Sequence, residues 1–269
     1  MDQCLTFDIS GDFGFFKKFY TTSSPLTYEI PPKTALTGII GAILGLSYKQ
    51  RYKLFECKFG IRILNPIRKI YLGINWLNTK VRNSKNFLNS SKEFLECLQL
   101  PTNPSIATFL GMGWTGQSPH TQAKLELLKE PKYRIYYPNT NIFFDDLIEQ
   151  IKAHKSFFTP FLGVSEFICD FKFHELYSLT KIENNISEIE ISTIIPTNLL
   201  NLDISNPINF KHSNLYKINT PYLMEYPRII KNYQDIFYNP LGKSIKVVVI
   251  EYYELRAKNN KNIENVVFF

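Results

Sequence analysis

Apolar and polar residues alternate over residues 4–10, where Leu5, Phe7 and Ile9 are apolar and their neighbours are mostly polar. A period of two residues is typical of a β-strand with one buried face. Over residues 34–46 the apolar side chains instead recur at helical spacing, after two consecutive prolines that suit the first turn of a helix. The start of the chain therefore predicts a strand, a loop and a helix.

The same patterns continue along the chain and predict further strands and one further helix. Residues 59–64 and 67–76 are rich in β-forming residues and are compatible with one long ribbon bent at a proline. The other predicted strands are residues 133–137 and 164–173, with a helix over residues 145–154 between them. The resulting order, β-α-β-β-α-β, is that of a ferredoxin-like unit, so the predicted fold class is α+β.

Two segments fall outside this pattern. Residues 77–119 are basic and rich in Asn and Ser, and so long an insertion in a compact domain is normally functional or mobile. After about residue 176 the chain has short predicted strands separated by Asn and Pro turns, over residues 186–195, 215–219 and 244–254. We therefore predict a domain over residues 1–175 with an insertion at about 77–119, and a smaller β-rich domain over 176–269.

Composition excludes several classes of protein. The longest apolar run, residues 39–46, is far shorter than the ~20 residues that a membrane helix needs, and we see no charged-then-apolar leader. The four cysteines are dispersed and favour reduced thiols in a cytoplasmic protein. The four histidines lack the spacing of zinc ligands, so we expect neither a metal site nor a cofactor.

Positive charge is concentrated in the first half of the chain. Residues 1–134 carry 18 Lys and Arg against 9 Asp and Glu, or +9, whereas residues 135–269 carry 13 against 15, or −2. Between Glu56 and Glu93 there are eight cations and no acid. Such a stretch creates a local positive field that suits a polyanion, although a solvated basic face explains the same count.

Residues 15–24 combine aromatic rings, cations and hydroxyl groups in the sequence FFKKFYTTSS. Rings stack on unpaired bases, lysines contact phosphates and hydroxyls contact 2′-OH groups, which together are what single-stranded RNA requires of a surface. An edge strand with buried Phe and solvated Lys produces the same pattern. Alternation therefore predicts that one face of this segment points inward and the other outward.

The glycines of the first predicted helix are Gly38, Gly41 and Gly45. A phosphate-binding loop needs its glycines before the helix and a Gly-Lys-Ser/Thr at the helix start. These glycines lie inside the helix and no such motif follows, so they predict close helix packing.

Several charged residues have structural explanations. Asp8 and Asp12 have no His, Lys or third acid nearby in sequence to complete a metal or general-base site, which favours turn and cap roles. Glu126 and Arg134 are expected to take part in local pairing that fixes the register of a strand, with contact to a partner as the second explanation.

Metal-independent cleavage of RNA needs a base, an acid and a cation, which His, Tyr and Lys supply. Nothing in the sequence brings such residues together, and a histidine that only satisfies hydrogen bonds is the commoner case. The candidates are His120 beside Thr121 and Gln122, Lys211 with His212, and Tyr28 with Lys33.

Five blocks of the sequence resemble the Cas-five subunit of CRISPR interference complexes, in the form found in type I-B systems. They are FDISGDFGFFKKFYTT, SPLTYEIPPKTALTGIIGAILG, LNPIRKIYLG, HTQAKLELLKEPKYRIYYP and TPFLGVSEFI. The blocks occur in the order of the family and span roughly residues 5–170. The remainder of the chain carries no comparable motif.

This resemblance implies a modified RNA-recognition fold with a thumb-like hairpin at residues 77–119. It implies a subunit of the crRNA-guided complex Cascade that caps the 5′ handle of the crRNA. Its protein partners would be the backbone subunit and the large subunit, and target DNA would be met only indirectly. The implied RNA contacts are Lys17, Lys18, Tyr20, Thr21, Thr22, Tyr28, Lys33 and Thr34, with Lys80, Arg82 and Lys85 on the thumb.

One branch of the same family, in type I-C systems, cleaves precursor crRNA with Tyr, Lys and His residues. The first predicted domain of this chain has no Lys-His pair, because Lys211 and His212 lie in the second. We therefore expect a non-catalytic protein, with a metal-independent endoribonuclease as the alternative.

Overall fold

The computed structural model describes residues 2–21, 24–77, 120–140, 142–184, 187–201, 214–225, 229–257 and 263–269. The chain forms two compact units. The first comprises Met1–Lys18, Thr27–Ile70 and Leu127–Phe269, and the second comprises Phe19–Leu26 and Tyr71–Glu126.

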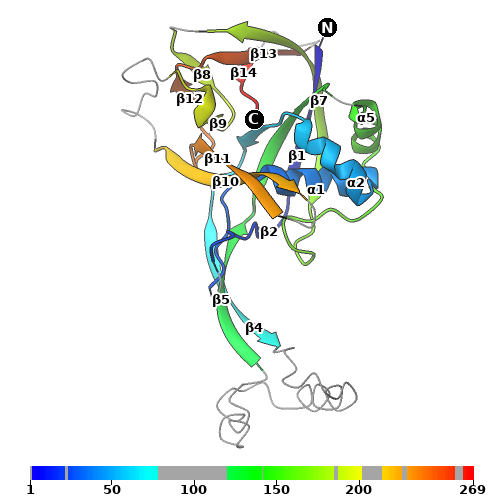
Figure 1. Ribbon diagram of the computed structural model, residues 1–269, viewed down its shortest axis with the longest axis vertical. Coiled ribbons are helices and arrows are strands. Elements are labelled where there is room, and N and C mark those ends of the chain that lie inside the picture. The colour runs from blue at the N-terminus through cyan, green and yellow to red at the C-terminus, as the bar shows by residue number, and fades with distance from the viewer. Residues whose placement is uncertain are drawn as a thin grey trace, which may run out of the picture. The chain divides into compact units, whose positions relative to one another are not determined.

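A six-stranded sheet in the order β14-β13-β7-β1-β6-β3 is the main element of the first unit (Figure 1). Every neighbouring pair is antiparallel, and the register places Phe7 opposite both Ile135 and Phe173. Its strands are β1 (Asp2–Ser10), β3 (Gly60–Ile63), β6 (Lys132–Pro138), β7 (Asp170–Glu183), β13 (Glu251–Ala257) and β14 (Ile263–Val266).

Three smaller sheets accompany it. One has the order β2-β5-β4, with β2 (Phe13–Gly14), β4 (Lys69–Leu77) and β5 (His120–Lys129). A second has the order β10-β11-β9, with β9 (Ile195–Pro196), β10 (Tyr216–Glu225) and β11 (Ile229–Tyr238). The third pairs β8 (Ile189–Ile191) with β12 (Ile245–Val247). A 3-10 turn, η3 (Thr197–Leu199), follows β9.

The helices begin and end where the sequence supplies the appropriate caps. Helix α1 (Lys33–Leu44) starts directly after Pro32 and ends at Gly45, whose φ of 66° is a left-handed conformation that glycine adopts without strain. Ser47 and Gln50 form a capping box at the start of the next helix. The remaining helical elements are α2 (Tyr48–Arg51), η1 (Tyr52–Glu56) and α5 (Phe144–Lys152).

Strand β1 is buried on both faces. Leu5, Phe7 and Ile9 join α1 and α5 in the main hydrophobic core. Cys4 and Thr6 are equally inaccessible on the opposite face, and the Thr6 hydroxyl donates to a backbone carbonyl of β7 over 2.8 Å. A strand buried on both faces is expected at the centre of a sheet whose two sides are each covered.

The six-stranded sheet curls until its two edge strands meet. Arg62 of β3 and Glu264 of β14 form an ion pair of 2.6 Å, although their strands occupy opposite ends of the strand order. Beside them, the backbones of Phe59 and Phe269 exchange two hydrogen bonds of 2.9 Å. A pocket of about 470 Å³, hereafter the polar pocket, lies at this junction and is lined by Arg62, Glu264, Tyr177, Glu190 and Asn265, among others.

Several predicted elements are confirmed. The strands over residues 4–10 and 133–137 and the helices over 34–46 and 145–154 correspond to β1, β6, α1 and α5, with ends within two residues. The predicted ribbon from residue 59 to 76 is two strands, β3 and β4, that belong to different sheets. Strand β5 was not predicted, and the insertion expected at 77–119 lies almost wholly outside the described residues.

The strand predicted over residues 164–173 is wrong in its first half. Strand β7 begins only at Asp170, because Gly163 turns the chain and a bridge between Phe161 and Ile168 closes a loop there. The boundary predicted at residue 175 falls inside β7, and β13 and β14 lie in the same sheet as β1. The C-terminal strands therefore complete the first unit, and the division into two units follows different segments.

Candidate nucleic-acid interface

A short hairpin positions the first residues of the candidate site. The amide of Phe16 donates to Thr27 Oγ1 over 2.9 Å, and the amide of Tyr28 donates to the carbonyl of Phe16 over 2.7 Å. These bonds pair the two arms of the hairpin around a bridge between Lys17 and Thr27. Lys17 points to solvent, whereas Phe16 and Tyr28 are buried, as the alternation in this segment predicted.

An open groove of about 490 Å³ lies beside this hairpin and along α1. Lys17, Tyr28 and Thr34, three of the residues predicted to contact RNA, line it together. The lining residues that were not predicted as contacts include Arg51, Phe158 and Phe161. The groove thus brings cations and aromatic rings from distant parts of the sequence to one place.

The aromatic wall of the groove belongs to the loop between α5 and β7. The amides of Phe157 and Phe158 donate to the carbonyls of Ile43 and Ala42, over 3.1 and 3.0 Å, and so attach the loop to the end of α1. Gly163 has a φ of 99°, and a Cβ at this position would lie only 1.7 Å from the carbonyl oxygen of Phe15. Only glycine allows this approach.

The rings of this wall are accessible. Phe158 is 63% exposed and Phe161 is 42% exposed. Two phenylalanine rings on one loop, both open to solvent and both lining a groove, are unusual for side chains that gain free energy from burial. They are available to stack on a planar group.

Small residues of α1 form the floor of the groove. A Cβ on Gly38 would meet no atom within 4 Å, so the missing side chain leaves open space. A Cβ on Gly41 would lie 3.0 Å from Cδ of Arg51, so the side chain of this arginine packs on the helix there. The prediction of close packing is therefore confirmed for Gly41 but not for Gly38, beside which there is open space.

Arg51 is fixed at the edge of the groove by two contacts. Its side chain packs on Gly41, and its guanidinium carbon lies 5.1 Å from the centre of the Tyr48 ring. Within the described part of the chain, neither Arg51 nor Lys17 forms an ion pair. Both cations therefore remain available to an anion from outside.

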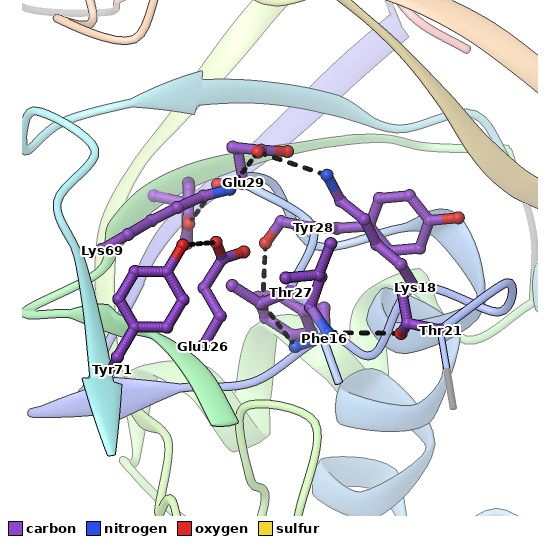
Figure 2. A network of polar contacts seen from close by, with 11 residues as sticks. Phe16, Lys18, Thr21, Thr27, Tyr28, Glu29, Lys69, Tyr71 and Glu126 are labelled. Atoms are coloured by element: carbon purple, nitrogen blue, oxygen red, sulfur yellow. Dashed lines mark hydrogen bonds and ion pairs between the residues drawn. The ribbon is translucent and has the colours of Figure 1, made fainter. Parts of the chain in front are cut away.

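Lys18, by contrast, is occupied by a carboxylate. Its Nζ lies 3.4 Å from Glu29 Oε1, and Lys69 forms an ion pair with the same oxygen (Figure 2). Lys18 and Glu29 are each only 13% exposed. This pairing holds Lys18 away from solvent.

Lys33 is not at the surface, so the structure does not support its predicted contact with RNA. It is 1% exposed, and its Nζ lies 4.0 Å from the centre of the Tyr222 ring and 5.8 Å from that of Phe59. Burial, with a smaller contribution from the nearby Lys58, lowers the pKa of Lys33 to about 8, although Cys57 acts in the opposite direction. The residue anchors the start of α1 to β10.

Two further predicted contacts lie in the second unit. Tyr20 is 61% exposed, and its ring meets that of Phe19 edge to face at 5.2 Å. Thr21 Oγ1 accepts a hydrogen bond from the amide of Leu26 over 3.2 Å and thereby stabilises the loop. The four remaining predicted contacts lie outside the described residues: Thr22, Lys80, Arg82 and Lys85.

Glu126 and Arg134 both pair with other side chains, but their partners are distant in the sequence rather than local, and Asp8 has a different role from the one predicted. Arg134 donates from Nε to Asp8 Oδ1 over 2.7 Å and from a terminal nitrogen to Oδ2 over 3.1 Å, across neighbouring strands. In the second unit, the Tyr71 hydroxyl donates to Glu126 over 3.1 Å (Figure 2). Asp8 thus pairs across the sheet rather than capping a turn.

The described residues do not assemble the predicted cleavage groups. Tyr28 lines the groove, but the ammonium of Lys33 lies among the Tyr222 and Phe59 rings. The side chains of His120 and Thr121 and residues 211–212 are outside the described part. Among the described side chains, no group of three His, Cys, Asp or Glu residues could hold a metal ion.

Comparison with known proteins finds similarity to CRISPR-associated proteins. Residues 4–104 match the family of CRISPR-associated proteins described as Cas_Cas5. A CRISPR protein from Archaeoglobus fulgidus is similar in structure, with a TM-score of 0.51 and 11% identity, over 99% of this chain and 98% of that chain. A chain of a CRISPR RNA-guided surveillance complex gives a TM-score of 0.50 and 13% identity, over 90% and 91%. No curated protein matches the sequence.

The Cas_Cas5 match covers the hairpin, α1 and α2, and hence Lys17, Thr34 and Arg51. Phe158 and Phe161 lie outside the residues that match this family. For that part of the chain, the similarity is one of structure. At these sequence identities the structural similarity shows a shared fold. In the described part of the chain, no helix is long and apolar enough to cross a membrane.

Proposed function

We propose that the chain is a non-catalytic, RNA-binding subunit of a CRISPR interference complex, and that it holds the single-stranded 5′ handle of the crRNA. The observation that carries this proposal is the groove, in which Lys17 and Arg51 lie without ion pairs beside the exposed rings of Phe158 and Phe161. Cations for phosphates next to rings for unpaired bases are the usual means of binding single-stranded nucleic acid.

The topology supports an RNA-recognition type of fold. Strands β7-β1-β6-β3 have the order of a ferredoxin-like β-α-β-β-α-β unit, with α1 and α5 as its helices. RNA-recognition modules of this kind stack bases on the exposed face of the sheet. Here Tyr136 on that face is fully buried beneath Leu255, Val266 and Phe268. RNA therefore binds at the hairpin and the groove instead.

The family match and the similar chain from a CRISPR RNA-guided surveillance complex support membership of such an assembly. By the resemblance to type I-B proteins, the partners are the crRNA, the backbone subunit and the large subunit in the cytoplasm. Exposed apolar side chains outside the groove, including Ile142 at 75% and Ile168 at 64%, are candidates for protein contacts.

Binding of the repeat-derived 5′ segment of the crRNA by the purified protein tests the central claim. If about six phosphates are neutralised, the logarithm of the association constant should fall with the logarithm of salt concentration at a slope near −4, at ~0.7 per phosphate. Lys17→Glu should weaken binding strongly, whereas Lys246→Glu, an equal charge change at an exposed position of β12, should have little effect. A slope near zero would contradict the proposal.

The absence of catalysis needs its own test. The same repeat RNA is incubated with the protein in EDTA and analysed on a sequencing gel. We expect intact RNA. Site-specific cutting would show instead that the protein is a metal-independent endoribonuclease, and the non-catalytic assignment would be abandoned.

A further inference from the structure

We propose that the groove is a single-nucleotide subsite: one unpaired base lies against Phe158 and Phe161 above Gly38, and its phosphate binds Arg51. This inference rests on the proposed function and adds to it the number of nucleotides that the groove accepts and the residues that hold each part. Arg51, Gly38 and the two phenylalanines are all residues that no sequence pattern marked as contacts.

The base half of the subsite follows from shape and exposure. The volume of about 490 Å³ is within the range of about 300–1,000 Å³ typical of small-ligand pockets. The wall presents two exposed phenylalanine rings, and the floor at Gly38 has no atom within 4 Å of a Cβ position. A space lined by exposed aromatic rings and open beside Gly38 can accommodate a planar ring.

The phosphate half follows from how Arg51 is held. Packing on Gly41 and stacking over Tyr48 restrict its rotamers before any ligand binds. A pre-oriented guanidinium loses less freedom on binding than a mobile lysine, and its planar fork matches two phosphate oxygens. Lys17 lines the same groove and supplies a second cation for the adjoining backbone.

Charge favours a nucleotide over a peptide as the occupant. None of the described residues that line the groove is acidic, while two are cationic. A hydrophobic peptide would gain from the rings but would leave both cations without partners. A nucleotide uses the rings and the cations together, which is why we assign the groove to RNA.

Paired variants test the phosphate contact. Arg51→Ala should lower the affinity for the repeat-derived RNA by about 10-fold or more relative to Lys49→Ala, which removes the same charge from an exposed position of the same helix. Arg51→Lys should recover only part of the loss. Gly41→Ala keeps every charge but displaces the arginine side chain, so it should also weaken binding.

Two variants test the contact with the base: Gly38→Leu, which fills part of the groove, and Phe158→Ala, which removes a ring. Gly38→Leu fills the floor and should reduce affinity without lowering the melting temperature, because leucine favours helix more than glycine does. Phe158→Ala should reduce affinity roughly 5- to 150-fold, the range for loss of one stacked base. Phe158→Ala should also be tested against RNAs that each lack the base at one position. At the position whose base stacks on Phe158, Phe158→Ala should cause no further loss of affinity.

The possible outcomes separate this inference from the proposed function. If the wild-type protein binds no RNA, the proposed function fails. If it binds RNA but Arg51→Ala equals Lys49→Ala and Gly38→Leu has no effect, the subsite is wrong and the function stands. If the same variants spare RNA binding but prevent assembly with the other subunits, the groove is a protein-docking site and the inference is overturned.

Discussion

The groove and the polar pocket are of similar volume, about 490 and 470 Å³, and both contain arginine and tyrosine, yet they offer opposite electrostatic environments. In the polar pocket, Arg62 is paired with Glu264, and on the neighbouring strand Arg134 is paired with Asp8. In the groove, Lys17 and Arg51 have no ion-pair partner among the described residues. The two sites thus differ in where carboxylates lie: Glu190 and Glu264 line the polar pocket with Arg62, whereas the described residues that line the groove include no acid.

The pairing in the polar pocket also fixes the charge state of its arginine, Arg62. Burial by itself would lower the pKa of Arg62, but Glu264 and Tyr136 more than offset it and raise the pKa above the ordinary value. Arg62 therefore stays protonated and stays paired. Its role is to join the two edges of the curled sheet, and the net charge of the chain overstates what is available for RNA.

The largest expected effect comes from breaking a pair near the polar pocket. Arg134→Ala leaves Asp8, which is 16% exposed, without its bidentate partner and should lower the free energy of unfolding by about 3–5 kcal/mol in urea titrations. Lys231→Ala breaks a pair with Glu225 in which both side chains are exposed, at 48% and 58%, and should cost less than about 1 kcal/mol. Equal losses for the two variants would mean that burial of the first pair has no energetic weight.

The second effect depends on pH and concerns Lys33. Its pKa falls from 10.5 to about 8 on folding, so between these values the unfolded chain binds more protons, and stability rises with pH. Below pH 8 the penalty is fully present, at roughly 3 kcal/mol before the Tyr222 ring offsets part of it. Lys33→Met should therefore be more stable than wild type at pH 7, with the difference shrinking towards pH 10.5.

The exposed Lys53→Met serves as the control for this measurement, because it makes the same substitution at the surface. A constant difference between Lys33→Met and wild type from pH 7 to 10 would show that Lys33 is charged and solvated in the folded protein. Its placement as a buried anchor would then be wrong.

The third effect is on the salt dependence of RNA binding. Lys17→Ala should make the slope less steep by about 0.7, the contribution of one phosphate on a single strand, and Arg62→Lys should leave the slope unchanged. Filter binding over a series of salt concentrations measures both. If Lys17→Ala left the slope unchanged and Arg62→Lys altered it, the phosphates would contact the polar pocket rather than the groove.

The smallest expected effect is at the floor of the groove. Gly38→Ala should raise stability by about 0.5–1 kcal/mol, because alanine restricts the unfolded chain and its Cβ meets no atom within 4 Å. Gly45→Ala should do the opposite, since φ is 66° there and the Cβ would lie 2.6 Å from the Phe157 ring. Thermal melting of the two variants tests whether the space beside Gly38 is open and the space beside Gly45 is filled by Phe157.

The strands and helices that the sequence predicted correctly are those whose burial pattern is local. Strand β1 alternates cleanly, and α1 and α5 have clear starts. Strand β5 was missed because residues 125–128 are all buried, Glu126 among them, which removes the period of two. The expected start of β7 was too early because apolar residues near 164–168 form a turn that depends on Gly163.

The candidate site was predictable only in its first arm. Lys17 could be identified because aromatic, basic and hydroxyl residues follow one another there, whereas Tyr28 and Thr34 were expected only from the family resemblance. The burial of Lys33 depends on Tyr222, which is far away in sequence, and no local pattern reports such a contact. Phe158 and Phe161 form an ordinary apolar segment in the sequence, and their exposure follows from how the loop attaches to α1.

The central place of β1 has a consequence for how the chain is made on the ribosome. Leu5 lies between Tyr137 and Leu176, so β1 acquires neither neighbour until about 130 further residues have been synthesised. Pairings so distant in sequence slow folding and leave an apolar segment accessible to chaperones or to other nascent chains. Expression at lower temperature, or together with holdase chaperones, should therefore raise the yield of native protein.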